Sequence, residues 1–207
     1  MTKSISSDTR IIPVTRQVRL TGIKEIMFDR YAGDNKTKLE WNQKIYLMPE
    51  TNVITLPIIN IVSFLTAHNT NSAPKRLRDK REYKDIANAC LSFVSVSNSK
   101  DKKLSDIPFL RDGKEIEVGD IKSGDSFDPK SGIWLHRTVA RLAKGIPNPQ
   151  ERPVLPLPWA LEFEVSIYPN KEIKEQELKN LVEEGGLAIG FGTFRGVYGK
   201  FIVDRWE

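Results

Sequence analysis

Residues 159–167 read Trp159-Ala160-Leu161-Glu162-Phe163-Glu164-Val165-Ser166-Ile167, and they show the clearest strand pattern in the chain. Its odd-numbered positions are large and apolar, and its even-numbered positions are mostly polar. Because side chains alternate between the two faces of a strand, the pattern predicts a half-buried β-strand. The polar face carries Glu162 and Glu164, so we expect this face to repel phosphates.

The elements around this strand have a characteristic order. Alternation of apolar and polar residues predicts strands, and apolar residues at helical spacing predict helices. Two glycines, Gly185 and Gly186, are expected to end the last helix. The predicted elements are, in chain order, a strand from Val14, a helix after Pro57, a helix at 78–90, a short β run at 91–97, the strand above, a helix at 173–184 and a strand at 201–203. This order predicts an α+β fold with a ferredoxin-like (RRM-like) β-α-β-β-α-β core.

Two insertions, at about 28–57 and 98–158, interrupt this core within a single domain of residues 1–207. The first is predicted to hold a hairpin that turns at 49–52. The second is predicted to hold a hairpin that turns at Asp112-Gly113.

Composition limits the chemistry open to the chain. It has 207 residues, a formal net charge of +5 and 39% apolar residues, which suits a folded domain and permits a polyanionic partner. A single cysteine, Cys90, excludes a disulfide framework. With only two histidines, His68 and His136, no Ser-His-Asp or Cys-His catalytic set can be argued, and a metal site is not expected. We expect no cofactor. No apolar run approaches the length of a membrane span, and the polar N-terminus lacks an apolar signal core, so we expect a cytoplasmic protein.

Positive charge is distributed unevenly along the chain. Segment 74–84 has six basic and two acidic residues, and segment 130–152 has five basic residues and one acidic residue, whereas segment 171–184 is net acidic. Basic clusters supply the phosphate contacts that drive nucleic-acid affinity. Taken alone, segment 74–84 is better explained as the solvated face of a helix.

The second basic segment is more informative because aromatic residues and prolines accompany its charges. Ile133–Leu142 has strand character, whereas 145–158 holds five prolines and is not expected to form regular structure. Aromatic rings on such a hairpin can stack on nucleotides. Trp134 is equally consistent with a core position.

Residues 185–201 form a glycine-rich segment with six of the 13 glycines in the chain. Such density indicates backbone at positive φ, or backbone that another group approaches closely. A tight loop that packs on its own sheet is an equally good explanation. The glycine spacing matches neither a dinucleotide-binding fingerprint nor a phosphate-binding P-loop.

The C-terminal third resembles a known family. The similarity is carried by Arg152-Pro153, by Trp159 opening an alternating strand, by an acidic helix, and then by Gly186, Gly190, Gly192, Arg195, Gly199 and Phe201 in that order. Over residues 132–203 the chain resembles the RAMP superfamily of CRISPR-associated proteins, in particular the Cas-seven group of backbone subunits and compact phage-borne relatives. It departs from the family pattern at Gly185, where alanine is commoner, and at Phe194, where tryptophan is commoner.

This resemblance implies a ferredoxin-like core and a protruding β-hairpin thumb. It also implies binding of a guide RNA that pairs with complementary RNA or DNA, and head-to-tail assembly of copies along the guide. The expected partners are therefore RNA, its target and further copies of the chain, without a membrane. The candidate RNA-binding residues are Arg16, Arg19, Lys75, Arg76, Arg78, Lys80, Arg81, Trp134, Arg137, Arg141, Lys144, Arg152, Gly190, Gly192 and Arg195.

Two other functions stay open. The first is a RAMP endoribonuclease, since some members of the superfamily cut RNA with a loop aspartate, and Asp34 lies in a glycine-containing loop with Asp29 nearby. A surface turn is the simpler explanation of Asp34, so we expect a protein without catalytic activity. The second is a ferredoxin-like structural or inhibitory protein that only docks into a larger assembly.

Overall fold

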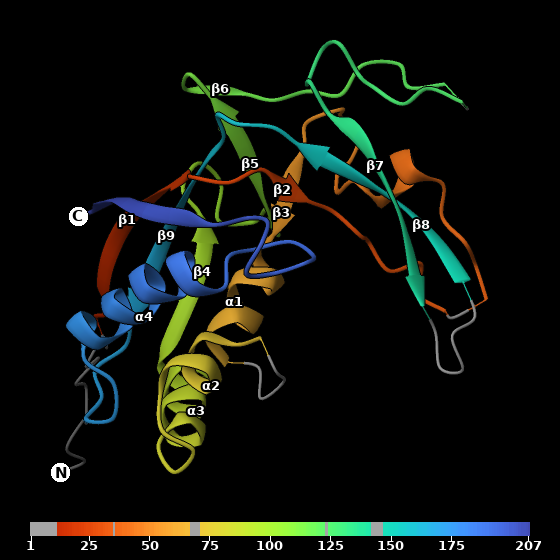
Figure 1. Ribbon diagram of the computed structural model, residues 1–207. Coiled ribbons are helices and arrows are strands. Elements are labelled where there is room, and N and C mark those ends of the chain that lie inside the picture. The colour runs from red at the N-terminus through yellow and green to blue at the C-terminus, as the bar shows by residue number, and fades with distance from the viewer. Residues whose placement is uncertain (1–11, 35, 67–70, 123, 142–146) are drawn as a thin grey trace, which may run out of the picture.

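A computed structural model describes residues 12–34, 36–66, 71–122, 124–141 and 147–207 (Figure 1). These residues form an α+β fold with antiparallel sheets, as the sequence predicts. The predicted strand at 159–167 is confirmed as β9 (Ala160–Ile167), and its odd-numbered side chains are buried.

β9 lies at the centre of the main sheet. It pairs along one edge with β1 (Val14–Gly22) and along the other with β4 (Val94–Asn98), and β1 also pairs with β10 (Phe201–Trp206). The order of these four strands is therefore β10-β1-β9-β4.

The two predicted insertions meet at the other end of β9. β5 (Asp106–Arg111) pairs there with β9, with β3 (Thr55–Pro57) and with the short β6 (Lys114–Glu115). The turn at Asp112-Gly113 is thus confirmed. The hairpin predicted in the first insertion is reduced to one bridge, between Leu47 and Ile54, because its first arm begins as a 3₁₀-helix, η1 (Trp41–Lys44).

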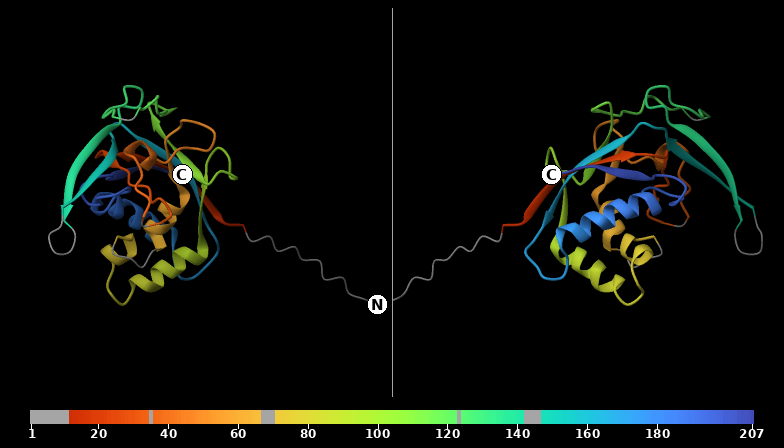
Figure 2. Two further views of the ribbon diagram at one scale, coloured as in Figure 1. Left: turned by 90° about the vertical axis from the view of Figure 1, so that its right-hand side faces the viewer. Right: turned by 60° about the vertical axis from the view of Figure 1, so that its left-hand side comes forward.

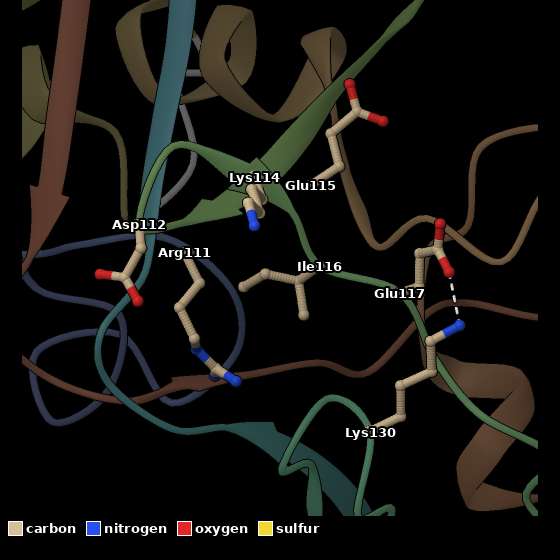
Figure 3. A pocket seen from close by; sticks show the side chains of 7 residues that line it. All are labelled: Arg111, Asp112, Lys114, Glu115, Ile116, Glu117 and Lys130. Carbon is tan, nitrogen blue, oxygen red and sulfur yellow. Dashed lines mark hydrogen bonds and ion pairs between the residues drawn. The ribbon is translucent and has the colours of Figure 1, made fainter.

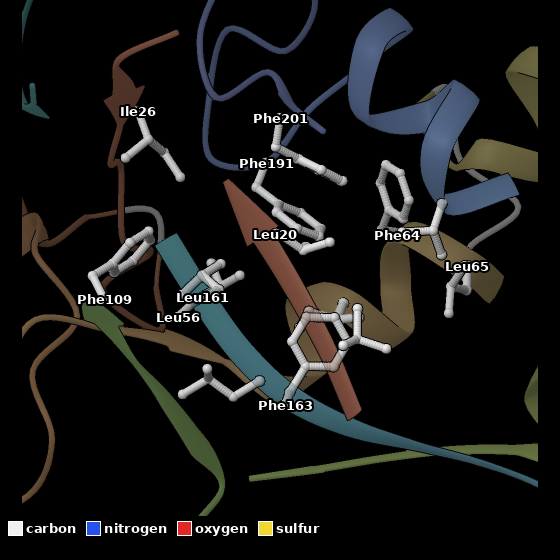
Figure 4. Packing of buried hydrophobic residues seen from close by; sticks show 14 of the residues in the cluster. Leu20, Ile26, Leu56, Phe64, Leu65, Phe109, Leu161, Phe163, Phe191 and Phe201 are labelled. Atoms are coloured by element: carbon white, nitrogen blue, oxygen red, sulfur yellow. The ribbon is translucent and has the colours of Figure 1, made fainter. Parts of the chain in front are cut away.

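The helices cover one face of the main sheet (Figures 1 and 2), and they are α1 (Ile58–Thr66), α2 (Ala73–Leu77), α3 (Tyr83–Phe93) and α4 (Glu175–Ala188). The core lies between the two layers (Figure 4). There Phe64 of α1 packs against Phe191 and Phe201, whose stacked ring centroids are 4.8 Å apart. Burying such rings supplies a large share of the hydrophobic stabilisation.

The helix predicted at roughly 78–90 is present as α3, but its predicted start is wrong. Asp79 caps a turn here, because its carboxylate accepts a hydrogen bond from the Arg81 N–H and its carbonyl accepts one from the Tyr83 N–H. α3 therefore starts only at Tyr83. It continues to Phe93, which is half-buried against the core, and β4 begins three residues later than the predicted β run at 91–97.

The prediction that Gly185 and Gly186 end the last helix is also wrong. Both are buried inside α4, which continues to Ala188. A Cβ on Gly186 would lie 2.6 Å from the carbonyl oxygen of Phe201, and one on Gly185 would overlap the ring of Phe64. The two glycines therefore allow α4 to pack closely against β10 and α1.

A second sheet of three strands carries a hairpin that projects from the body of the molecule (Figures 1 and 2). Its strands are β2 (Ile26–Met27), β7 (Trp134–Arg141) and β8 (Pro147–Leu155). The expectation that 145–158 lacks regular structure is thus wrong for residues 147–155.

The prolines of β8 fit the sheet because of their positions. All three occupy odd-numbered positions, 147, 149 and 153. The carbonyl of Pro153 accepts a hydrogen bond from the Phe28 N–H, so odd-numbered backbone groups point away from β7. The missing N–H groups therefore interrupt no hydrogen bond between β7 and β8.

Candidate nucleic-acid interface

The glycine-rich loop, residues 189–200, joins α4 to β10 and packs on its own backbone. Gly190, Gly192, Gly196 and Gly199 have φ values of +78°, +77°, +92° and +69°. A Cβ on Gly190 would overlap the Gly199 carbonyl, and one on Gly192 would overlap the Met27 carbonyl. Close packing within the chain therefore accounts for these glycines, whereas the nearest atom to a Cβ on Gly196 is 3.8 Å away.

The tip of this loop presents apolar side chains to solvent. Phe194 has a positive φ of +53° and is 51% exposed, and Val197 is 64% exposed. A positive φ at a bulky residue is strained, so the surrounding loop must hold it. The ring of Phe194 is thereby available to a partner.

Aromatic side chains form a row where the hairpin meets this loop. The ring centroids of Trp134 and His136 are 5.7 Å apart, and those of His136 and Tyr198 are 6.1 Å apart. Trp134 also donates its indole N–H to Glu25 at 3.4 Å. Because side chains alternate along a strand, residues 134, 136 and 138 share one face of β7. We call it the inner face, because it is turned toward the glycine-rich loop. The side chain of Trp134 is partly exposed at this junction.

Arg152 pairs with His136 in the register of the β7–β8 hairpin, and its side chain connects the hairpin to the glycine-rich loop. Its guanidinium lies 5.3 Å from the centre of the Phe194 ring, a cation–π contact. Its Nε donates to Asp29 at 2.7 Å, while its Nη1 is buried without a hydrogen-bond partner among the described residues. Buried donors without a partner are rare in proteins, so this nitrogen is a sign of a missing acceptor.

Asp29 serves a second cation. The Lys44 Nζ lies 3.2 Å from Asp29 and donates at 2.8 Å to the carbonyl of Glu151. The side chains of Lys44 and Arg152 are only 9% and 12% exposed. One carboxylate therefore neutralises two nearly buried cations, which leaves an excess of positive charge.

Arg195 adds to this excess from the loop. Its guanidinium donates from Nε to the Gly192 carbonyl at 3.2 Å and from Nη1 to the Asn71 carbonyl at 3.0 Å. No carboxylate in the described part of the chain pairs with it, and burial lowers its pKa. Since guanidinium groups remain protonated in proteins, Arg195 carries a charge that the described residues do not balance.

The other candidate residues are placed differently. On the main sheet, Arg16 pairs with Glu175 at 2.6 Å, and Arg19 pairs with Glu162 and Asp204. On the hairpin, Arg137 lies on the outer face and pairs with Glu151 at 3.0 Å. Arg141 is the last residue of β7, and Lys144 lies outside the described residues.

The expectation of an acidic sheet face needs correction. Glu162 pairs with Arg19 and Arg205, and Glu164 pairs with Lys102 and accepts a hydrogen bond from Gln17. These partners cancel the charge of both carboxylates. The open face of the sheet is therefore balanced around these residues, and it offers little excess positive charge to attract RNA.

The basic segment 74–84 begins beside the loop, three residues after Asn71, whose carbonyl binds Arg195. It comprises most of α2, the turn that follows and the first two residues of α3. Arg78 is occupied by Glu184 at 2.9 Å, whereas Arg76, Lys80 and Arg81 are exposed. The Lys75 ammonium lies 5.9 Å from the centre of the Tyr83 ring. Exposed cations therefore continue the positive surface from the loop along α2.

Asp34 has the geometry of a turn residue. Its carboxylate accepts hydrogen bonds from the backbone N–H groups of Lys36 and Thr37 at 2.6 Å and from the Thr37 hydroxyl at 2.7 Å. These bonds, above all that from the hydroxyl, lower the pKa of Asp34. A carboxylate so stabilised is a poor general base.

The described part of the chain offers little else for catalysis. Burial raises the pKa of Cys90 to about 12, so its thiol is not a nucleophile at neutral pH. Among the residues that the structure describes, no group of three or more His, Cys, Asp or Glu side chains could hold a metal ion. No described helix is long and apolar enough to cross a membrane.

A pocket of about 320 Å³ lies around the turn between β5 and β6, on the side of β9 away from β10 (Figure 3). Its rim has three basic and three acidic side chains. Lys130 pairs with Glu117, and Arg111 donates to the carbonyls of Ser131, Pro156 and Pro158. The charges balance, so this pocket does not extend the positive surface.

Arg152, Trp134 and Arg195 are site residues predicted from the sequence, and the structure brings these three together around the glycine loop. The sequence-based prediction did not include Lys44, Phe194 or Tyr198. The two aromatics had a usable signal, since each lies between glycines in a loop. Lys44 had none, because its partners are distant in the sequence. No protein-family model and no curated protein matches the chain.

Replacing Asp29 tests the charge cluster. Asp29→Asn should lower the free energy of unfolding by about 3 kcal/mol, because it leaves Lys44 and Arg152 nearly buried without a carboxylate. Asp34→Asn makes the same chemical change at an exposed turn and should shift the urea midpoint far less. Urea unfolding followed by tryptophan fluorescence measures both variants. Equal midpoints for the two would contradict a structural role for the cluster.

Proposed function

We propose that this chain is a guide-RNA-binding backbone subunit, similar to the RAMP superfamily, and that copies of it assemble along an RNA to recognise complementary nucleic acid. The observation that carries the proposal is the excess positive charge of Arg152, Lys44 and Arg195 directly beside aromatic rings that are exposed or partly exposed. Phosphates would balance the cations, and unpaired bases would stack on Phe194 and on the row from Trp134 to Tyr198.

This combination favours a single strand over a duplex. Bases are accessible for stacking only where they are unpaired, and side chains recognise single-stranded RNA in this way. Two occupied cations of the main sheet, Arg19 on the open face and Arg16 on the face beside α4, are poor candidates for phosphate contacts. The proposed path of RNA therefore follows the inner face of the hairpin, the glycine loop and α2.

The topology is compatible with the proposal. Four strands in the order β10-β1-β9-β4, with helices between β1 and β4 and between β9 and β10, have the element order of a ferredoxin-like core. We assign the role of the thumb to the projecting β7–β8 hairpin. In this proposal the protein has no catalytic role, since Asp34 is committed to its own turn.

The salt dependence of RNA binding tests the proposed path. Arg76→Ala combined with Arg81→Ala should weaken binding of any single strand alike. It should flatten the slope of log affinity against log salt by about 0.7 for each phosphate that the variant no longer neutralises. The matched control is Lys171→Ala with Lys174→Ala, which removes two exposed lysines from the acidic segment. Fluorescence anisotropy over a salt series measures the slopes. If both double variants keep the parent slope, α2 is only a solvated surface.

Assembly is tested with RNAs of increasing length. Head-to-tail contacts do not close on themselves, so the number of bound copies should rise with RNA length. Mass photometry should therefore show particle masses that increase in steps of one protomer, and nuclease footprints should be periodic. A mass that stays at one protomer for every RNA length would leave a monomeric binder.

A further inference from the structure

A small pocket of about 220 Å³ lies beneath the glycine loop. Its apolar wall is formed by Phe28 and Leu56, both buried. Its polar lining is provided by Asp29, Tyr46, Asn60, Thr193 and Arg195, and Gly192 completes it. Three parts of the chain that are distant in sequence thus converge here: the segment from β2 to β3, α1 and the glycine loop.

The size of the pocket limits what can enter. Pockets that hold drug-sized ligands usually measure about 300–1,000 Å³. A volume below that range suits one planar ring system with an apolar face, not a stacked pair. Since Phe28 and Leu56 present apolar surface, the expected occupant has a flat apolar face and a polar edge.

Donors and acceptors stand on the same rim. Asp29 accepts one bond from Arg152 and pairs with Lys44, yet its side chain remains 27% exposed, so it can accept further bonds. Arg195 uses Nε and Nη1 for carbonyls, and its Nη2 has no partner in the described part of the chain. A carboxylate in the lining disfavours a phosphate as the occupant.

We propose that this pocket binds one unstacked guanine base. Guanine has two neighbouring N–H donors on its Watson–Crick edge, which match a carboxylate such as Asp29. It also has the O6 and N7 acceptors, which match an arginine such as Arg195. Asn60 and Thr193 can bond to the rest of the edge. Burial raises the pKa of Tyr46, which keeps its hydroxyl protonated as a donor.

This inference rests on the proposed function, because it identifies a base within the strand that the aromatic row holds. The loop that bears Phe194 also bears Thr193 and Arg195. A base that leaves the stack at Phe194 is therefore beside the pocket. RNA binding would then be largely independent of sequence, apart from one position at which guanine is preferred.

Two sets of probes test the pocket. The first compares oligouridine with the same strand carrying a single guanosine, or a single adenosine, by fluorescence anisotropy. The guanosine strand should bind about tenfold more tightly than oligouridine. The second titrates guanosine and adenosine monophosphates into ¹⁵N-labelled protein. Guanosine monophosphate should shift the Asn60 side-chain amide and the Arg195 Nε–H signals.

Variants separate the pocket from general RNA binding. Asn60→Ala should abolish the guanosine preference while oligouridine is still bound. Asn88→Ala, an exposed amide on α3, should keep the preference.

Each outcome decides the question. Binding of all strands alike, or a preference for adenosine, would overturn the guanine pocket and leave the proposed function intact. Nucleotide shifts without strand binding would support the pocket and contradict the proposed function. Absence of both would contradict both.

Discussion

The site depends on one set of backbone hydrogen bonds, which fastens the glycine loop to β2. The Gly199 N–H donates to the carbonyl of Glu25 at 2.7 Å, and the Thr193 N–H donates to that of Met27 at 2.9 Å. These bonds require the loop backbone to approach β2 so closely that a side chain at Gly192 would collide with it. Because β2 pairs with β8, this contact holds the hairpin beside the loop and sets the distance between the aromatic residues of the two.

Charge is arranged around this contact in an unusual way. Elsewhere on the molecule several candidate arginines are neutralised, as Arg16 is by Glu175 and Arg137 by Glu151. Next to the loop, one carboxylate faces two nearly buried cations, and Arg195 has only carbonyl partners among the described residues. Burying charge without a counter-charge is costly, and an anionic partner, as we propose, would offset this cost. That contrast within one molecule is the main physical support for RNA binding.

Elements with a local pattern could be predicted from the sequence, and contacts between distant segments could not. β9 was predictable because its alternation has a period of two. β8 was not predictable, because prolines are unfavourable inside a strand unless their missing N–H groups point away from the paired strand. The sequence alone does not show in which direction these groups point. Gly185 and Gly186 resemble a helix C-terminus locally, and only the positions of Phe64 and Phe201 explain them. The same holds for the site. Its arginines and Trp134 could be predicted from charge and aromatic content. The contact of Arg152 with Asp29 could not, because the two residues are 123 positions apart and share no local pattern.

The proposed RNA path is best tested by photocrosslinking of the protein to single-stranded RNA containing 4-thiouridine, with the linked residues identified by mass spectrometry. We expect crosslinks at Phe194, Tyr198 and Trp134, where the loop meets the inner face of the hairpin. Crosslinks confined to the open sheet face, at Gln17 or Ser166, would contradict it.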